Sequence, residues 1–171
     1  MAGEQLTIVT VNYNTSAFLE VSLRALAALT KNIYKVIICD NGSGWLDRRR
    51  LRRIARRYEN VELIFRRQSG PGSTGHGEAL NLLIEKIDTP YGAMLDADAT
   101  FLKKHWDDIL IGKLGEGVKI IGAPPTKGNR LKANDFPLTY AVLFDATVFR
   151  SLKIDLRPRN PETGQDTGYE M

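Results

Sequence analysis

Six short apolar runs alternate with amphipathic stretches along this chain, and this alternation constrains its fold more than any other feature. The apolar runs, which are strand candidates, lie at residues 6–11, 34–39, 61–65, 91–95, 118–121 and 138–144. Helix candidates lie at about 18–29, 46–58, 78–87 and 145–152. Alternation of strands and helices in this order predicts an α/β fold with three layers, α/β/α, around a mostly parallel central sheet.

The length and composition fit one domain. A chain of 171 residues with 43% hydrophobic residues can bury a sizeable core. Because no repeat or low-complexity linker interrupts it, residues 1–171 are expected to form a single domain. The one cysteine, Cys39, lies in an apolar run, which favours a packed thiol in a cytoplasmic protein. No apolar stretch approaches the roughly 18 residues that span a bilayer, and the first run is too short for a secretory signal.

Two carboxylates, Asp96 and Asp98, follow the apolar run at 91–95. Open α/β sheets bind ligands at the carboxyl ends of their strands. Two carboxylates at such an end suit a hard divalent cation, which prefers oxygen ligands and can also hold a diphosphate. The same spacing also occurs by chance in solvated strand ends and helix caps, so the pair gains weight only from its neighbours.

Other polar residues follow the neighbouring strand candidates. Asn12 and Tyr13 come after the first run, Asp40 after the second, and a glycine-rich stretch at 70–77 after the third. The carboxyl ends of parallel strands share one rim, so these residues are expected to lie together. A ring can stack on a base, a carboxylate can accept from a base N–H, and glycine backbone can approach phosphate. Turn chemistry explains each residue alone, whereas the set favours a nucleotide-diphosphate site.

Two segments are expected to be flexible loops. The stretch at 68–77 has neither the Gly-Lys-Ser/Thr of a Walker A loop nor the acidic partner of a Rossmann fingerprint. We interpret it as a connection whose glycines let it close over a ligand. The second segment, at 124–137, is polar and is expected to be a mobile loop.

The two histidines, His76 and His105, have no partner at metal-ligand spacing, so zinc is not expected. His76 borders the predicted rim. It is therefore a candidate for contact with phosphate, although a histidine without a role at a helix end is equally compatible with its position.

Positive charge is concentrated in one segment. Residues 48–67 hold nine arginines and two acids, whereas the whole chain has a net charge of +4. Arginines at 48–57 surround an apolar stripe of the helix candidate at 46–58. Arg48–Arg57 is either a solvated face or a peripheral dock for anionic lipid headgroups, at the inner membrane surface, or another polyanion. No nucleic-acid-binding module is recognisable, so no specific nucleic acid is expected.

Four segments of the chain, taken in their order and spacing, resemble motifs of the family 2 glycosyltransferases. The catalytic domain of that family has the GT-A fold, which is the Rossmann-like architecture of nucleotide-diphospho-sugar transferases. The first two resemble the family's first strand and loop and its second strand with an Asp-Asn-Gly-Ser ending. The others resemble its Gly-x-x-x-Ala-x-Asn helix start and its Asp-x-Asp strand. They lie at 7–14, 37–43, 75–81 and 95–98.

The resemblance implies roles for the rim residues. Tyr13 and Asp40 would hold the nucleotide base, and Asn12 and Gly75 would complete the nucleotide-binding set. Asp96 would face the ribose or a metal-bound water. Asp98 would ligate Mn²⁺ or Mg²⁺, which the family uses as its cofactor.

The family inverts configuration with a carboxylate as general base. Gln165-Asp166-Thr167 resembles the Glu-Asp pair that carries this base, which nominates Asp166, although Gln165 departs from the family's usual Glu. The chain also stops at Met171, where the family usually continues to complete its acceptor side. A truncated or minimal domain is therefore expected, with an acceptor site that is incomplete or completed by a partner.

The sequence thus predicts an inverting, metal-dependent glycosyltransferase. It would move a sugar from a nucleotide-sugar donor to a hydroxyl of a glycan, lipid-linked or small-molecule acceptor. One alternative is a nucleotidyltransferase on a similar sheet, although residues 12–15 lack the glycine and lysine of its phosphate loop. The other is a non-catalytic nucleotide-sugar-binding module that docks through the basic helix.

Overall fold

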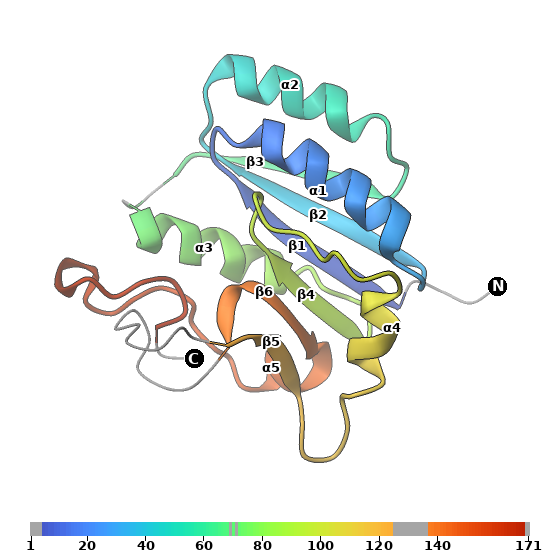
Figure 1. The fold of residues 1–171 in the computed structure, drawn as a ribbon. Helices are drawn as coiled ribbons and strands as arrows, with labels where there is room; N and C mark the ends of the chain where they lie inside the picture. Colours follow the sequence, from blue (N-terminus) through green and yellow to red (C-terminus); the bar gives the residue numbers. More distant parts are fainter. Residues whose placement is uncertain (1–4, 69, 71, 125–136, 170–171) are drawn as a thin grey trace.

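The computed structural model describes residues 5–68, 70, 72–124 and 137–169 as a central sheet with helices packed on it (Figure 1). The sheet has six strands in the order β3-β2-β1-β4-β6-β5. The strands are β1 (Leu6–Asn12), β2 (Tyr34–Asn41), β3 (Val61–Arg66), β4 (Tyr91–Leu95), β5 (Ile120–Ala123) and β6 (Leu138–Asp145).

Five α-helices are described, together with one short 3-10 helix at Pro161–Thr163. The α-helices are α1 (Ser16–Leu29), α2 (Trp45–Ala55), α3 (Gly72–Ile84), α4 (Trp106–Ile111) and α5 (Ala146–Ser151). In the described part of the chain, none of them combines the length and apolar character that crossing a bilayer requires.

The sheet is mostly parallel, as predicted. β3, β2, β1 and β4 run parallel, and α1, α2 and α3 connect them in turn. β6 pairs antiparallel with both β4 and β5. The chain moves outward from β1 to β3 and then returns to place β4 on the other side of β1. This reversal makes the carboxyl ends of β1 and β4 a topological switch point, where open α/β sheets bind ligands.

The sheet is buried on both faces, which confirms the predicted three layers. Helices α1, α2 and α4 cover one face, where Leu23, Leu51 and Trp106 join the core. Helices α3 and α5 cover the other face with Leu83 and Phe149. Burial on both faces explains why the parallel strands are continuous apolar runs rather than alternating ones.

Cys39 is fully buried in β2, between β1 and β3. Burial raises the pKa of its thiol to about 11, because the thiolate would lose its hydration. The expectation of a packed thiol in this strand is therefore confirmed.

The glycine-rich stretch is not the flexible loop that the sequence predicts, because α3 already begins at Gly72. Its glycines serve close packing. A Cβ on Gly75 would lie 2.5 Å from the carbonyl oxygen of Gly70, and one on Gly77 would lie 2.6 Å from that of Leu156. Residues without a Cβ are required at these two positions so that the helix can approach its neighbours, and over residues 72–77 the prediction of a flexible loop is wrong.

Two smaller differences concern the second half of the chain. β5 begins at Ile120, two residues later than expected, and the six-residue helix α4 is absent from the sequence-based assignment. A helix of fewer than two turns has too few residues to establish a periodicity. Of the polar loop expected at 124–137, residues 125–136 lie outside the described residues.

Asp107 in α4 anchors the connection between α1 and β2. Its buried carboxylate accepts hydrogen bonds from the backbone N–H of Lys31 (2.9 Å) and Asn32 (2.8 Å), and from the Asn32 side-chain amide (2.8 Å). Burial by itself raises the pKa of Asp107, but these hydrogen bonds outweigh burial and hold the pKa below its ordinary value.

We expect Asp107→Asn to lower the free energy of unfolding by about 2–3 kcal/mol at neutral pH, because hydrogen bonds to a charged acceptor are worth about 1.5–3 kcal/mol. The lowered folded-state pKa makes this contribution complete above the unfolded value of about 3.9 and lost as the pH falls through the folded value. Urea unfolding across this range measures it. The exposed Asp108→Asn is the control, and a difference that grows on acidification would contradict the assignment.

Candidate active site

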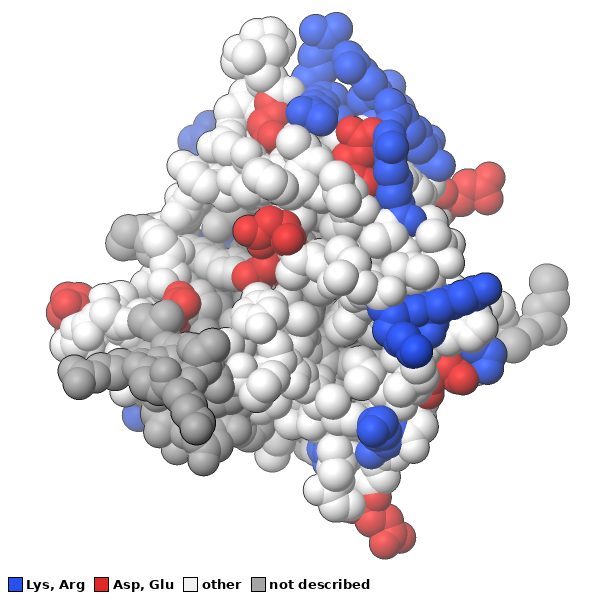
Figure 2. Space-filling view, viewed as in Figure 1, with Lys and Arg blue, Asp and Glu red and all other residues white. Residues whose placement is uncertain are grey.

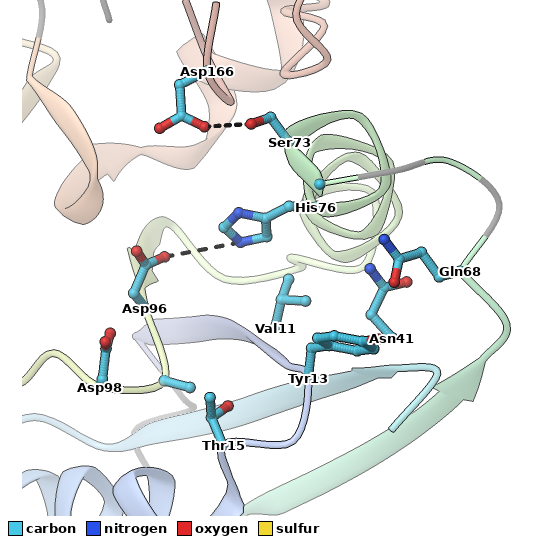
Figure 3. Close-up of a pocket in the computed structure, with 12 residues that line it drawn as sticks. Val11, Tyr13, Thr15, Asn41, Gln68, Ser73, His76, Asp96, Asp98 and Asp166 are labelled. Carbon is cyan, nitrogen blue, oxygen red and sulfur yellow. Dashed lines mark hydrogen bonds and ion pairs between the residues drawn. The ribbon is translucent and has the colours of Figure 1, made fainter. Parts of the chain in front are cut away.

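A cavity of about 440 Å³ lies at the carboxyl edge of the sheet, at the switch point between β1 and β4 (Figure 3). This volume is in the range of small-molecule sites. Its wall combines the ends of β1, β2 and β4, the start of α3 and a segment near residue 166. Its polar lining comprises Tyr13, Thr15, Asn41, Gln68, Ser73, His76, Asp96, Asp98 and Asp166.

The end of β4 delivers Asp96 and Asp98 to the cavity. The backbone N–H of Asp96 donates to the carbonyl oxygen of Tyr140 (2.8 Å), and a turn to Ala99 follows. Burial raises the pKa of Asp96, and the Asp98 and Asp166 carboxylates add to the rise, whereas His76 opposes it. The cavity therefore concentrates negative charge that the protein itself compensates only in part.

Helix α3 and the segment near residue 166 form the opposite wall. The Ser73 hydroxyl donates to Oδ1 of Asp166 (2.7 Å), and the backbone N–H of Thr167 donates to the same oxygen (2.7 Å). His76 lies with Nδ1 3.4 Å from the Thr167 hydroxyl and Nε2 3.9 Å from Oδ1 of Asp96. His76 thus lies between the carboxylate of Asp166 and that of Asp96, as Figure 3 shows.

Asn12 does not reach the cavity, because its side chain organises the loops behind the wall. It is fully buried, and its Nδ2 lies 3.0 Å from Oδ2 of Asp40 and 2.8 Å from Oδ2 of Asp47 in α2. Its Oδ1 accepts from the Thr15 hydroxyl (3.1 Å). The loop after β1, which carries Tyr13, is therefore fixed to the start of α2.

Asp40 and Gly75 also lie behind the lining. Asp40 is fully buried, and its Oδ1 forms an ion pair with Nε of Arg48 at 2.8 Å. The carbonyl oxygen of Gly75 accepts from Nδ2 of Asn41 (3.1 Å), which joins α3 to the end of β2. Of the nucleotide-binding set, the structure thus brings only Tyr13 and Asp96 to the cavity, where Asp98 and Asp166 join them. Their roles stay predictions.

Four polar lining residues escape the sequence-based selection: Thr15, Asn41, Gln68 and Ser73. Asn41 has a signal in the sequence, since it follows Asp40 at the end of a strand. Its Oδ1 is buried without a hydrogen-bond partner among the described residues. Ser73 has no such signal, because its importance depends on Asp166, which lies 93 positions away.

The family assignment follows from a comparison with known families. Residues 7–162 match the model of glycosyl transferase family 2. The chain belongs to this family. The predicted resemblance to the family 2 glycosyltransferases is thereby confirmed at the level of the family, and this favours a glycosyltransferase over a nucleotidyltransferase. No curated protein matches the sequence.

Solved structures of glycosyltransferases share the GT-A fold of this family 2 domain. The mannosyltransferase PcManGT from Pyrobaculum calidifontis, in complex with GDP-Man and Mn²⁺, has a TM-score of 0.68 at 15% identity, over 89% of this chain and 47% of that one. TarS 1-349 from S. aureus has 0.66 at 12% identity, over 91% and 52%. Glucosyl-3-phosphoglycerate synthase from Mycobacterium tuberculosis, with Mn²⁺ and UDP, has 0.61 at 17%, over 85% and 58%. The chain thus spans about half the length of these proteins.

The cavity residues of this family 2 domain fit a divalent cation that binds together with a phosphate-containing ligand. In the described part of the chain, no group of three or more His, Cys, Asp or Glu side chains is arranged to hold a metal. Mg²⁺ needs only one or two carboxylates when water and substrate phosphates complete its coordination. Asp96 and Asp98 can supply these carboxylates, and the described cavity lining contains no lysine or arginine that would compete.

Proposed function

We propose that this domain transfers a sugar from a nucleotide-sugar donor to an acceptor hydroxyl, with metal assistance and inversion at the anomeric carbon. The observation that carries the proposal is the cavity at the β1/β4 switch point. It holds three carboxylates, Asp96, Asp98 and Asp166, on two opposing walls of a GT-A fold.

The nucleoside end of the donor fits beside Tyr13 and Asn41. The Tyr13 ring is exposed on the cavity wall and can stack on a base. Oδ1 of Asn41 has no hydrogen-bond partner among the described residues, and a base N–H can donate to it when the side chain turns toward the cavity. Asp40 is fully buried behind the lining, where its carboxylate contacts Arg48 and Asn12, so its predicted contact with a base requires these contacts to open.

The diphosphate end fits beside Asp96 and Asp98. These two residues would hold Mn²⁺ or Mg²⁺ together with the diphosphate, and the bound cation would offset the charge that develops on the leaving group. His76, which faces the same space, can donate a hydrogen bond to a phosphate oxygen.

Asp166 is the proposed general base. Both hydrogen bonds that it accepts end on Oδ1, and no described residue donates to Oδ2. Oδ2 can therefore take the proton of the acceptor hydroxyl while that oxygen attacks the anomeric carbon. The bond between this carbon and the diphosphate oxygen breaks on the opposite side, and the nucleoside diphosphate leaves while the sugar stays on the acceptor.

We expect one of UDP, GDP and dTDP to bind with an affinity at least about tenfold higher in Mn²⁺ than in a chelator, because the cation neutralises the diphosphate beside two carboxylates. Titration calorimetry with each nucleotide, with and without Mn²⁺, measures this. Absence of metal-dependent binding to all three would overturn the proposal. Binding without release of nucleoside diphosphate from any donor would instead identify a non-catalytic binding module.

A further inference from the structure

We propose that the outward face of α2 binds the surface of an anionic phospholipid bilayer. This surface, called the arginine face below, consists of Arg49, Arg50 and Arg53 in α2 and of Arg56 and Arg57 in the turn directly after it. Figure 2 shows basic side chains gathered over α2 at the top of the molecule. The inference goes beyond sugar transfer, and its evidence is separate from the cavity.

The arginine face carries a large excess of positive charge. Glu20 of α1 is the one described acid that it contacts, and this acid pairs with Arg57 at 2.7 Å and Arg50 at 3.5 Å. Arg49, Arg53 and Arg56 are exposed and form no ion pair with a described carboxylate. Three cations thus project to solvent without an internal partner, although a fold gains nothing from like charges at this spacing.

A groove between α1 and α2 gives these charges a concave shape. Its volume is about 380 Å³, and Arg49, Arg50, Arg53 and Arg57 line it together with Glu20. A phosphate group that enters this groove meets several guanidinium groups, whose fork of N–H donors matches phosphate oxygens. The shape therefore favours clustered phosphates over a diffuse counterion atmosphere.

Apolar side chains beside the arginines favour a bilayer as the occupant. Trp45 and Leu46, in the first turn of α2, are 69% and 64% exposed, and Leu46 also lines the groove. Tryptophan prefers the interface between headgroups and acyl chains, and leucine gains free energy from hydrocarbon. A nucleic-acid backbone offers phosphates but no hydrocarbon into which Leu46 could insert.

Trp45 and Leu46, the apolar residues beside the arginine face, lie close to the cavity. Gly44, directly before Trp45, donates its backbone N–H to Oδ1 of Asn14 (2.9 Å), and the neighbouring Tyr13 lines the cavity. A docked domain would therefore hold its donor site close to the headgroups. If the proposed transferase function holds, this placement favours an acceptor that is attached to a lipid.

Partition into vesicles tests the proposal without nucleotide or turnover. The protein is expected to bind vesicles of phosphatidylcholine with phosphatidylglycerol and not those of phosphatidylcholine alone. Replacing Arg49, Arg53 and Arg56 together by Gln should lower the partition coefficient about 100-fold, the factor expected for three arginines near an anionic surface. The matched control replaces the exposed Lys103, Lys104 and Lys113 by Gln and should change partition far less. Equal losses in both triple variants would overturn the proposal.

Tryptophan fluorescence reports whether Trp45 and Leu46 insert. The chain has two tryptophans, and Trp106 is 2% exposed and stacked on Phe101, so a change on binding comes from Trp45. A blue shift with anionic vesicles that is smaller after Leu46→Ser supports insertion, and its loss after Trp45→Phe shows that Trp45 is the reporting residue. Tighter binding to heparin or RNA than to vesicles, with no blue shift, would overturn the bilayer in favour of a soluble polyanion.

Discussion

Asp166→Asn is expected to lower kcat by about 10²–10⁴-fold, the contribution of a positioned general base. Asparagine keeps the size of the side chain and can still accept from Ser73 and Thr167 through its Oδ1. It cannot take a proton from the acceptor hydroxyl. Affinity for the donor nucleotide should stay nearly unchanged, because in the proposed mechanism the reacting oxygen of Asp166 contacts the acceptor rather than the diphosphate.

Release of nucleoside diphosphate during turnover, together with calorimetry of the same variant, measures this separation of turnover from binding. Glu162→Gln is the matched control, because it removes a carboxylate from an exposed position of the same segment. Full turnover by Asp166→Asn would show that another group takes the proton. Loss of binding and turnover together would place Asp166 in the donor site instead.

Asp98→Asn is expected to remove the Mn²⁺-dependent part of nucleotide binding, with a loss of about 100-fold or more in the presence of the cation, because metal coordination of a diphosphate is worth several kcal/mol. The variant keeps the shape of the side chain and removes its charge. Binding in chelator should be similar to that of the wild type, or slightly tighter, since one carboxylate no longer repels the diphosphate.

Glu116→Gln, at an exposed position between α4 and β5, controls for the lost charge. Titration with Mn²⁺ at fixed nucleotide, followed by calorimetry, reports the apparent metal affinity. An unchanged response to Mn²⁺ in Asp98→Asn would remove Asp98 from the metal site. The Asp166 and Asp98 variants therefore separate chemistry from binding on the two walls of one cavity.

The strands could be predicted because burial on both faces of the sheet requires continuous apolar runs in the sequence. All six were expected within about two residues of their observed bounds, and β2 extends past the apolar run only to include Asp40 and Asn41. Helix α3 was misplaced at its start because glycines usually mark loops. Only the structure shows that Gly75 and Gly77 are needed for close approach within a helix.

The site was predictable as a region rather than residue by residue. The parallel strands β3, β2, β1 and β4 bring the residues that follow them to one edge of the sheet, and the alternation of strands and helices in the sequence indicates this parallel arrangement. Whether a side chain there faces the cavity depends on contacts that no local pattern encodes. The Asp40 carboxylate accepts a hydrogen bond from Arg48, eight positions later, and is buried. The Asp166 carboxylate instead accepts from Ser73, 93 positions earlier, and lines the cavity.

The buried thiol of Cys39 offers a way to follow this domain without any assay of sugar transfer. It is the one cysteine of the chain and lies in the interior of the sheet, and its raised pKa suppresses the reactive thiolate. Alkylating reagents can therefore reach it only through large-scale opening of the sheet. Any ligand that binds the native state must slow this labelling, so the alkylation rate converts into an affinity for candidate donors, whatever the acceptor is.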